Sequence, residues 1–196
     1  MTPEKALNFL LEGNQRFLLN MRINRNYLEQ VRDTSEGQFP FATVLSCIDS
    51  RIPTEIIFDQ GVGDLFNARI AGNFVNDDII GSLEFACKVA GSKLIMVLGH
   101  TSCGAIKGAC DDVHLGKLTQ MLEKIKPAVN AVQTEAEEAR NSSNLDFVNK
   151  VSIENVKIAT KAIRDSSEVL RDMIDKHEIE VVGAIYDVSS GRVELI

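Results

Sequence analysis

Apolar residues along this chain follow two different patterns, which predict alternating helices and strands. Near the N-terminus an apolar stripe with helical spacing follows Thr2, Pro3 and Glu4, a typical helix start. Later, short and nearly continuous apolar runs predict strands that are buried on both faces. These predicted strands cover residues 41–46, 64–70, 93–99 and 180–186, and a final short strand covers 192–196.

Amphipathic and polar segments predict the helices between these strands. The first of these helices is short and lies within 24–38, the second is capped by Asp77 or Asp78 and reaches residue 89, and the third covers 103–111. A long polar helix kinked near Pro127 follows over 117–140. The last two helices cover 145–164 and a segment that is capped by Ser166 or Ser167 and reaches residue 176. Apolar strands separated by helices indicate an α/β fold. We expect four parallel strands plus a C-terminal edge strand, flanked by helices, in a single domain over 1–196. Within it, residues 1–38 form an N-terminal helical arm and residues 39–196 form the α/β core.

Composition narrows the class of partners. The 196 residues are 44% hydrophobic and 25% charged, as is usual for a soluble globular protein. A net charge of −7 argues against nucleic acid and anionic membranes as partners. No run approaches the roughly 18 apolar residues of a membrane span, and residues 1–20 lack the continuous apolar stretch of a signal peptide. These features predict a cytoplasmic protein, and they leave a removed leader peptide open.

Two short motifs carry the candidate chemistry. Cys47, Asp49 and Arg51 form C-x-D-x-R, and His100 and Cys103 form H-x-x-C. Each motif directly follows a predicted strand, where open α/β sheets place their sites. Two thiolates and one imidazole suit zinc, and three protein ligands leave a fourth position open, as in catalytic zinc sites. Taken singly, each cysteine is also compatible with a small core residue, and the Asp49–Arg51 pair with a structural salt bridge.

Together with these motifs, further segments give the chain a resemblance to a known family. CIDSR at 47–51 and HTSCGA at 100–105 are similar to the motifs of β-class carbonic anhydrases. The resemblance extends to EGNQRF at 12–17, FDQGVGDLFNARIAGN at 58–73, GSLEFA at 81–86, VLGH at 97–100 and GAIYDVSSGRVE at 183–194. It therefore covers much of the chain.

The resemblance implies a zinc lyase, a carbonate dehydratase that hydrates carbon dioxide reversibly to bicarbonate and a proton. Cys47, His100 and Cys103 would bind one Zn²⁺ per chain, and zinc-bound hydroxide would attack the substrate. Asp49 and Arg51 would form a catalytic pair. An ionised Asp49 only accepts hydrogen bonds, so it would take the remaining hydrogen of the zinc-bound oxygen, while Arg51 keeps it ionised and oriented. In a closed site Asp49 would instead become the fourth zinc ligand.

The same resemblance implies pocket residues and partners. Phe66 and Phe85 would line the apolar pocket, and Phe85 stands where plant members have a tyrosine. Gln38 and the backbone N–H of Gly104 would hold a substrate or bicarbonate oxygen. Core packing for the two phenylalanines, and an exposed loop amide for Gln38, are the simpler interpretations. Family members assemble through their N-terminal arms, which implies a homodimer or homotetramer here.

Two other functional classes are compatible with the sequence. The first is an enzyme of related fold that hydrolyses carbon disulfide or carbonyl sulfide, which pocket shape would distinguish. The second is a non-catalytic zinc-binding or thiol redox module. A redox module would favour a C-x-x-C pair, and the four cysteines contain none.

Overall fold

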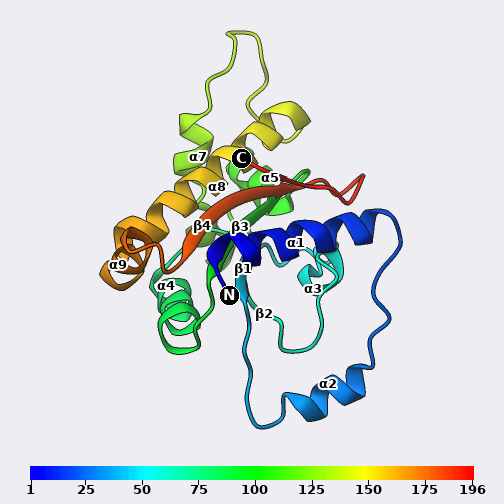
Figure 1. Ribbon diagram of the computed structural model, residues 1–196. Coiled ribbons are helices and arrows are strands. Elements are labelled where there is room, and N and C mark those ends of the chain that lie inside the picture. The colour runs from blue at the N-terminus through cyan, green and yellow to red at the C-terminus, as the bar shows by residue number, and fades with distance from the viewer.

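The computed structural model describes residues 1–196 and contains one five-stranded sheet with helices on both faces (Figure 1). The strand order is β2-β1-β3-β4-β5. The first four strands run parallel, and β5 pairs with β4 in the antiparallel direction. The strands are β1 (Ala42–Ser46), β2 (Leu65–Arg69), β3 (Leu94–His100), β4 (Glu180–Tyr186) and β5 (Val193–Leu195). The predicted fold, with four parallel strands and a C-terminal edge strand, is confirmed.

The sheet separates two hydrophobic clusters because side chains alternate between its faces. Met96 on β3 belongs to one cluster, whereas its neighbours Ile95 and Val97 belong to the other. The first cluster includes residues from α1 (Pro3–Leu18), α3 (Thr54–Ile57), α5 (Gly104–Cys110), α6 (Gly116–Leu122) and α7 (Lys126–Ala131). The second includes residues from α4 (Asp77–Glu84), η1 (Phe85–Val89) and α9 (Glu168–Asp175), and α8 (Leu145–Ser166) contributes to both. None of the helices is both long and apolar enough to cross a lipid bilayer.

Capping side chains fix where several helices begin. Thr2 accepts a hydrogen bond from the backbone N–H of Lys5, and Ser167 accepts one from Leu170. The predicted cap of α4 was wrong by one position: Asn76 is extended and its side chain accepts from Ile79, so Asp77 lies in the first turn. The helix also ends earlier than expected as an α-helix, because residues 85–89 continue it as the π-helix η1.

The long helix predicted over 117–140 is wrong. The segment instead forms two short helices, α6 and α7, followed by a loop without helix. Pro127 lies in the first turn of α7, where a proline starts a helix rather than kinking one. Ile125, between the two helices, is completely buried. The guanidinium of Arg140 donates to the carbonyls of Val129 and Val132, so it satisfies the end of α7 and holds the loop back on it.

The N-terminal segment reaches away from the sheet. After α1 the chain runs out to α2 (Tyr27–Asp33), which lies apart from the body in Figure 1 and buries none of its residues. Asp59 anchors the segment between α1 and α2. Its side chain is only 2% exposed, and its Oδ2 and Oδ1 atoms lie 2.5 Å from the Arg16 Nε and the Arg25 Nη1 atoms, respectively. A buried carboxylate therefore ties the segment between α1 and α2 to the end of α3.

The strand order creates one preferred place for a site. From β1 the chain goes first to β2 on one side, and then crosses to β3 on the other side. The loops after β1 and β3 therefore leave the sheet in opposite directions and open a crevice at the carboxyl ends of these strands. Both motifs singled out in the sequence lie at this crevice.

Candidate metal centre

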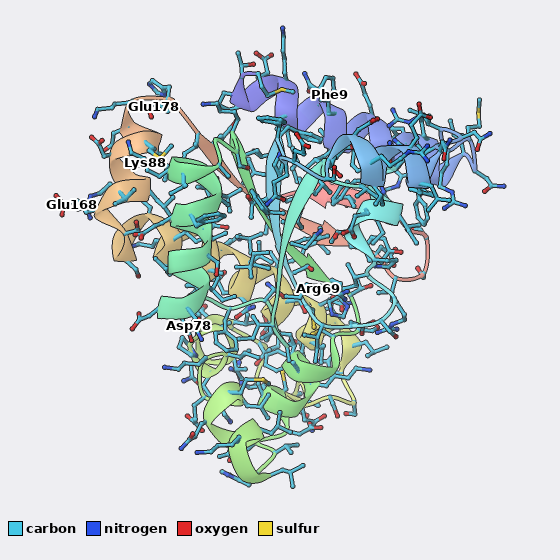
Figure 2. All side chains as sticks on the ribbon, turned by 90° about the horizontal axis from the view of Figure 1, so that it is seen from below. Phe9, Arg69, Asp78, Lys88, Glu168 and Glu178 are labelled. Carbon is cyan, nitrogen blue, oxygen red and sulfur yellow. The ribbon has the colours of Figure 1, made fainter.

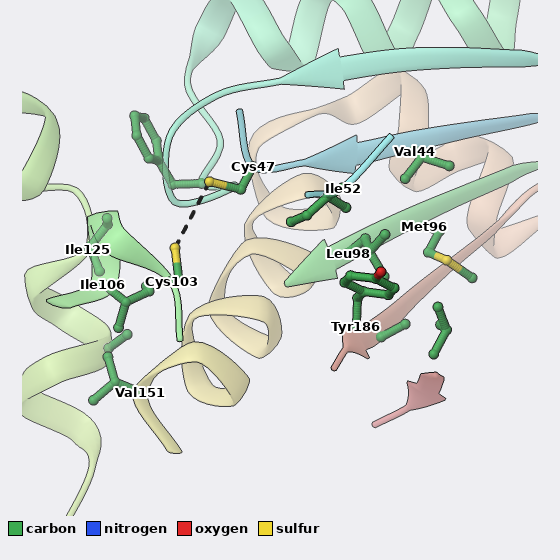
Figure 3. Close-up of a cluster of buried hydrophobic side chains, with 14 of the residues drawn as sticks. Val44, Cys47, Ile52, Met96, Leu98, Cys103, Ile106, Ile125, Val151 and Tyr186 are labelled. Carbon is green, nitrogen blue, oxygen red and sulfur yellow. Dashed lines mark hydrogen bonds between the residues drawn. The ribbon is translucent and has the colours of Figure 1, made fainter. Parts of the chain in front are cut away.

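Three ligand residues from two strand ends converge at the crevice. Cys47 directly follows β1, His100 is the last residue of β3, and Cys103 precedes α5. One ligand atom from each residue lies within 4.8 Å of the other two, and the two sulfur atoms are 4.0 Å apart (Figure 3). A tetrahedral zinc ion holds neighbouring sulfur ligands about 3.8 Å apart. The spacing and chemistry of this donor set therefore fit zinc.

The imidazole of His100 is oriented for a metal. Its side chain is fully buried, and its Nδ1 atom lies 3.0 Å from the carbonyl oxygen of Thr101. A carbonyl can only accept, so this contact assigns the proton to Nδ1 and leaves the lone pair on Nε2. Nε2 has no hydrogen-bond partner although it is buried. An unsatisfied buried acceptor beside two thiols is the arrangement expected of a metal ligand with a carbonyl behind it.

The sulfur atoms of Cys47 and Cys103 interact directly and shift each other's pKa. A hydrogen bond from Cys103 lowers the pKa of Cys47, and the N–H of Gly72, 3.4 Å from the Cys47 sulfur, acts in the same direction. The pKa of Cys103 is raised, first because it donates to Cys47 and then because it is buried. The pair therefore holds one negative charge readily. A divalent cation would displace the second proton and hold both sulfurs as thiolates.

Asp49 and Arg51 form a tight ion pair beside this donor set. Arg51 donates from Nε to Oδ1 at 2.9 Å and from Nη2 to Oδ2 at 2.7 Å, and its backbone N–H also donates to Oδ1 at 2.9 Å. The side-chain hydrogen bonds from Arg51 hold the pKa of Asp49 well below its usual range. The Oδ2 atom lies 4.0 Å from Nε2 of His100. An ionised carboxylate oxygen is thus directed toward the place where the metal would lie.

Two residues that the motifs did not reveal support the position of Cys47. Gly72 donates its N–H to the Cys47 sulfur and has a φ of +81°, a conformation that glycine adopts without strain. The buried Asn155 on α8 donates to the carbonyl of Gly72 at 2.7 Å. Gly72 lies in the FDQGVGDLFNARIAGN segment already singled out, whereas Asn155 is an ordinary helix residue that no sequence pattern marks.

The predicted pocket residues are only partly brought together. Gly104 directly follows Cys103, and space is open beside its Cα atom. Phe66 and Phe85 pack edge to face with ring centroids 6.2 Å apart, and they line a hollow that contains none of the three metal-ligand candidates. Gln38 lies on an exposed segment and forms no hydrogen bond with any residue of the centre. In one protomer, therefore, these three side chains are not part of the centre.

The other two cysteines do not extend the centre. Burial raises the pKa of Cys87 to about 12, and burial followed by the neighbouring Asp111 raises that of Cys110 to about 11. Both stay protonated at neutral pH, so neither is an activated thiol. All four cysteines are free. This arrangement favours the metal-binding interpretation over a redox module.

Comparisons with known proteins agree with this geometry. The sequence pattern described as carbonic anhydrase matches residues 42–193. The chain is 30% identical to the carbonic anhydrase of Mycolicibacterium smegmatis, over 98% of this chain and 93% of that protein. It is 31% identical to carbonic anhydrase 2 of Mycobacterium tuberculosis, over 98% and 92%. The crystal structure of the β-carbonic anhydrase CafA of Aspergillus fumigatus superimposes with a TM-score of 0.75 at 26% identity, covering 86% of this chain and 81% of that one. The chain belongs to the β-class carbonic anhydrase family.

Proposed function

We propose that this protein catalyses the reversible hydration of carbon dioxide to bicarbonate and a proton, with one zinc ion held by Cys47, His100 and Cys103. Carbon dioxide hydration is the activity of the family to which the chain belongs. The observation that carries the proposal is the convergence of three zinc-type ligand atoms within 4.8 Å, next to an ionised carboxylate. Zinc, when bound, supplies a Lewis acid that makes water reactive near neutral pH.

In this proposal Asp49 orients the reacting water. An ionised carboxylate has no proton to donate, so it accepts a hydrogen bond from that water and directs a lone pair toward carbon dioxide. Arg51 occupies both carboxylate oxygens and keeps Asp49 ionised across the neutral range. The side chain of Arg51 is 50% exposed and that of Asp49 only 16% exposed, so the pair lies at the boundary between solvent and the centre.

Stopped-flow measurement of carbon dioxide hydration tests this function. The zinc-loaded protein should accelerate the reaction over buffer, and Asp49→Asn should lower kcat by roughly 10²- to 10⁴-fold, the usual contribution of a positioned acid or base. Zinc content should stay at one per chain in the variant. Asp112→Asn is the matched control, because Asp112 also pairs with a cation, Lys126, and is exposed. A zinc-loaded wild-type protein no faster than buffer would reject the proposal.

We further propose that the protein acts as a homodimer or homotetramer in which residues 1–38 form an arm against a second copy and residues 39–196 form the core. The apolar side chains on and after α2 support this: Leu28 is 73% exposed and Phe39 is 89% exposed. Burying such side chains is favourable at roughly 25 cal/mol per Å². In this proposal Gln38, Phe66 and Phe85 complete the substrate pocket at the interface between copies.

Light scattering at micromolar protomer concentration tests the assembly. The wild-type protein should give at least a dimer mass, and Leu28→Glu combined with Phe39→Asp should shift it toward the monomer. A monomeric wild-type protein would refute the proposal.

A reducing compartment keeps zinc-binding thiols from forming disulfides, which favours the cytoplasm as the place of action.

A further inference from the structure

The segment that carries Cys47 and Asp49 lies beyond the hydrogen-bonded part of its strand. The last ladder bond of β1 on the β2 side runs from the N–H of Ile70 to the carbonyl of Ser46, at 3.0 Å. After Ser46 the chain leaves the sheet. The ladder therefore does not fix the carbonyls of Cys47 and Asp49, although both residues must keep their place at the centre.

Arg69 donates hydrogen bonds to the backbone beyond the end of the ladder. It is the last residue of β2 and lies in register with Ser46; Figure 2 shows it where this strand ends. Its Nε atom donates to the carbonyl of Cys47 at 3.0 Å, and its Nη2 atom donates to the carbonyl of Asp49 at 2.7 Å. One guanidinium thus spans the backbone of a metal-ligand candidate and of the carboxylate residue.

The hydrogen bonds within the Asp49–Arg51 pair do not fix the position of the pair relative to the rest of the protein. All three hydrogen bonds within the pair join residues two positions apart, and the carbonyl of Asp49 otherwise accepts only from Ile52 in the same turn. These contacts make the turn rigid internally but do not fix its distance from His100. The segment is held from outside by the buried side chain of Ile52, by the contacts of the Cys47 sulfur with Gly72 and Cys103, and by the two bonds from Arg69. Only the bonds from Arg69 reach its backbone carbonyls from outside the turn.

Arg69 has no competing role. Its side chain forms no salt bridge with any carboxylate in the chain, and the residue is exposed, so it contributes little to the core. Hydrogen bonds with a charged donor are stronger than neutral ones, and a planar guanidinium can reach two acceptors at a fixed separation. Lysine offers one point charge and cannot reproduce this geometry.

We propose that Arg69 is a positioning residue that holds the Cys47–Asp49 segment against β2 and so sets the distance between the Asp49 carboxylate and the metal centre. This inference rests on the proposed carbon dioxide hydration for its effect on activity, but its structural part can be tested without turnover.

The first measurement is amide hydrogen exchange of the zinc-loaded protein. The N–H groups of Arg51 and Ile52 are bonded to Asp49, so their exchange reports on the turn. In Arg69→Ala these two amides should exchange at least about tenfold faster, while amides in β3 remain unchanged. Unchanged exchange in the turn would overturn the proposal, whatever the activity of the protein.

The second measurement is activity, with Arg140→Ala as the matched control. Arg140 also bridges two backbone carbonyls, but at the end of α7. Arg69→Ala should retain one zinc per chain and lose about 10- to 100-fold in kcat, since small displacements of reacting groups cost rates of this size. Arg69→Lys should recover little, and added guanidinium ion should partly restore Arg69→Ala. Arg140→Ala should keep the wild-type kcat.

The outcomes separate the two proposals. Faster turn exchange in Arg69→Ala together with an inactive wild-type protein would reject the proposed function and keep the positioning role. An active wild-type protein in which Arg69→Ala loses no more kcat than Arg140→Ala, or loses it only through loss of zinc, would reject the positioning role.

Discussion

Replacing Gly72 with alanine should destabilise the protein through two effects that can be measured separately. The backbone of Gly72 has a φ of +81°, and a residue with a Cβ in this region costs roughly 1–2 kcal/mol. The added Cβ would also lie 2.5 Å from the Cδ1 atom of Ile125, which is completely buried. Overpacking of this kind costs about 1–3 kcal/mol. Gly72→Ala should therefore lower the free energy of unfolding by about 2–5 kcal/mol.

Gly91 provides the matched control for the backbone effect. It has a nearly identical φ of +83°, but nothing lies within 4 Å of a Cβ built there. Gly91→Ala should therefore show only the backbone cost. The excess destabilisation of Gly72→Ala over Gly91→Ala measures the contact with Ile125, and Ile125→Val should remove most of it, because valine lacks the Cδ1 atom.

Denaturant titration of zinc-loaded protein at one fixed protomer concentration gives the required free energies, since bound metal and assembly both shift stability. The wild type, the two single variants and the double variant at positions 72 and 125 form a double-mutant cycle. If Gly72→Ala and Gly91→Ala agree to within about 0.5 kcal/mol, or if Ile125→Val does not relieve the excess, the steric reasoning is refuted.

Three further outcomes are expected. Burial raises the pKa of Asp59, but hydrogen bonds from two arginines outweigh it and leave the pKa below its usual value. Because the folded state therefore favours the ionised carboxylate, Asp59 stabilises the fold above pH ~4, and this stabilisation is lost as the pH falls through the folded pKa. Asp59→Asn should flatten the dependence of unfolding free energy on pH between about 5 and 3, and an unchanged slope would contradict it. Asn155→Ala should cost about 1–3 kcal/mol in a denaturant titration because it leaves the Gly72 carbonyl unpaired, and a neutral result would show that water replaces the amide. Removal of zinc with a chelator should lower the melting temperature while far-ultraviolet circular dichroism stays native; an unfolded metal-free chain would show that the ligands are not preorganised.

The parts of the fold that follow from local sequence were predictable. The strand predicted at 180–186 has the same bounds as β4, because nearly continuous apolar residues leave few alternatives for a segment of that length. The helix predicted over 117–140 failed because its polarity suggested a solvated helix, whereas Ile125 is drawn into the core and Arg140 ends α7 from a distant position. Such contacts depend on tertiary structure and leave no periodic signal.

The centre was predictable in its ligands but not in its supports. Cysteine and histidine at strand ends are recognisable in a sequence because their side chains are typical zinc ligands. In the structure the ligand atoms of Cys47, His100 and Cys103 lie within 4.8 Å of one another. Arg69 and Asn155 act through backbone carbonyls, which no sequence pattern reveals: Arg69 lies in the 58–73 segment already singled out, but nothing there indicates its contacts, and Asn155 is not marked at all. Gln38, Phe66 and Phe85 remain predictions, because one protomer does not bring them to the centre.

The ligands of the proposed zinc lie at the carboxyl ends of β1 and β3, and each of these two strands has a paired neighbour on both sides. The sheet and the hydrogen bonds that hold the segments at these strand ends, rather than the ion, therefore keep the donor atoms in place. We therefore expect this chain, unlike a small zinc finger that folds only around its metal, to complete folding first and to bind zinc afterwards. How quickly newly made protein becomes active would then follow the supply of zinc rather than the rate of folding.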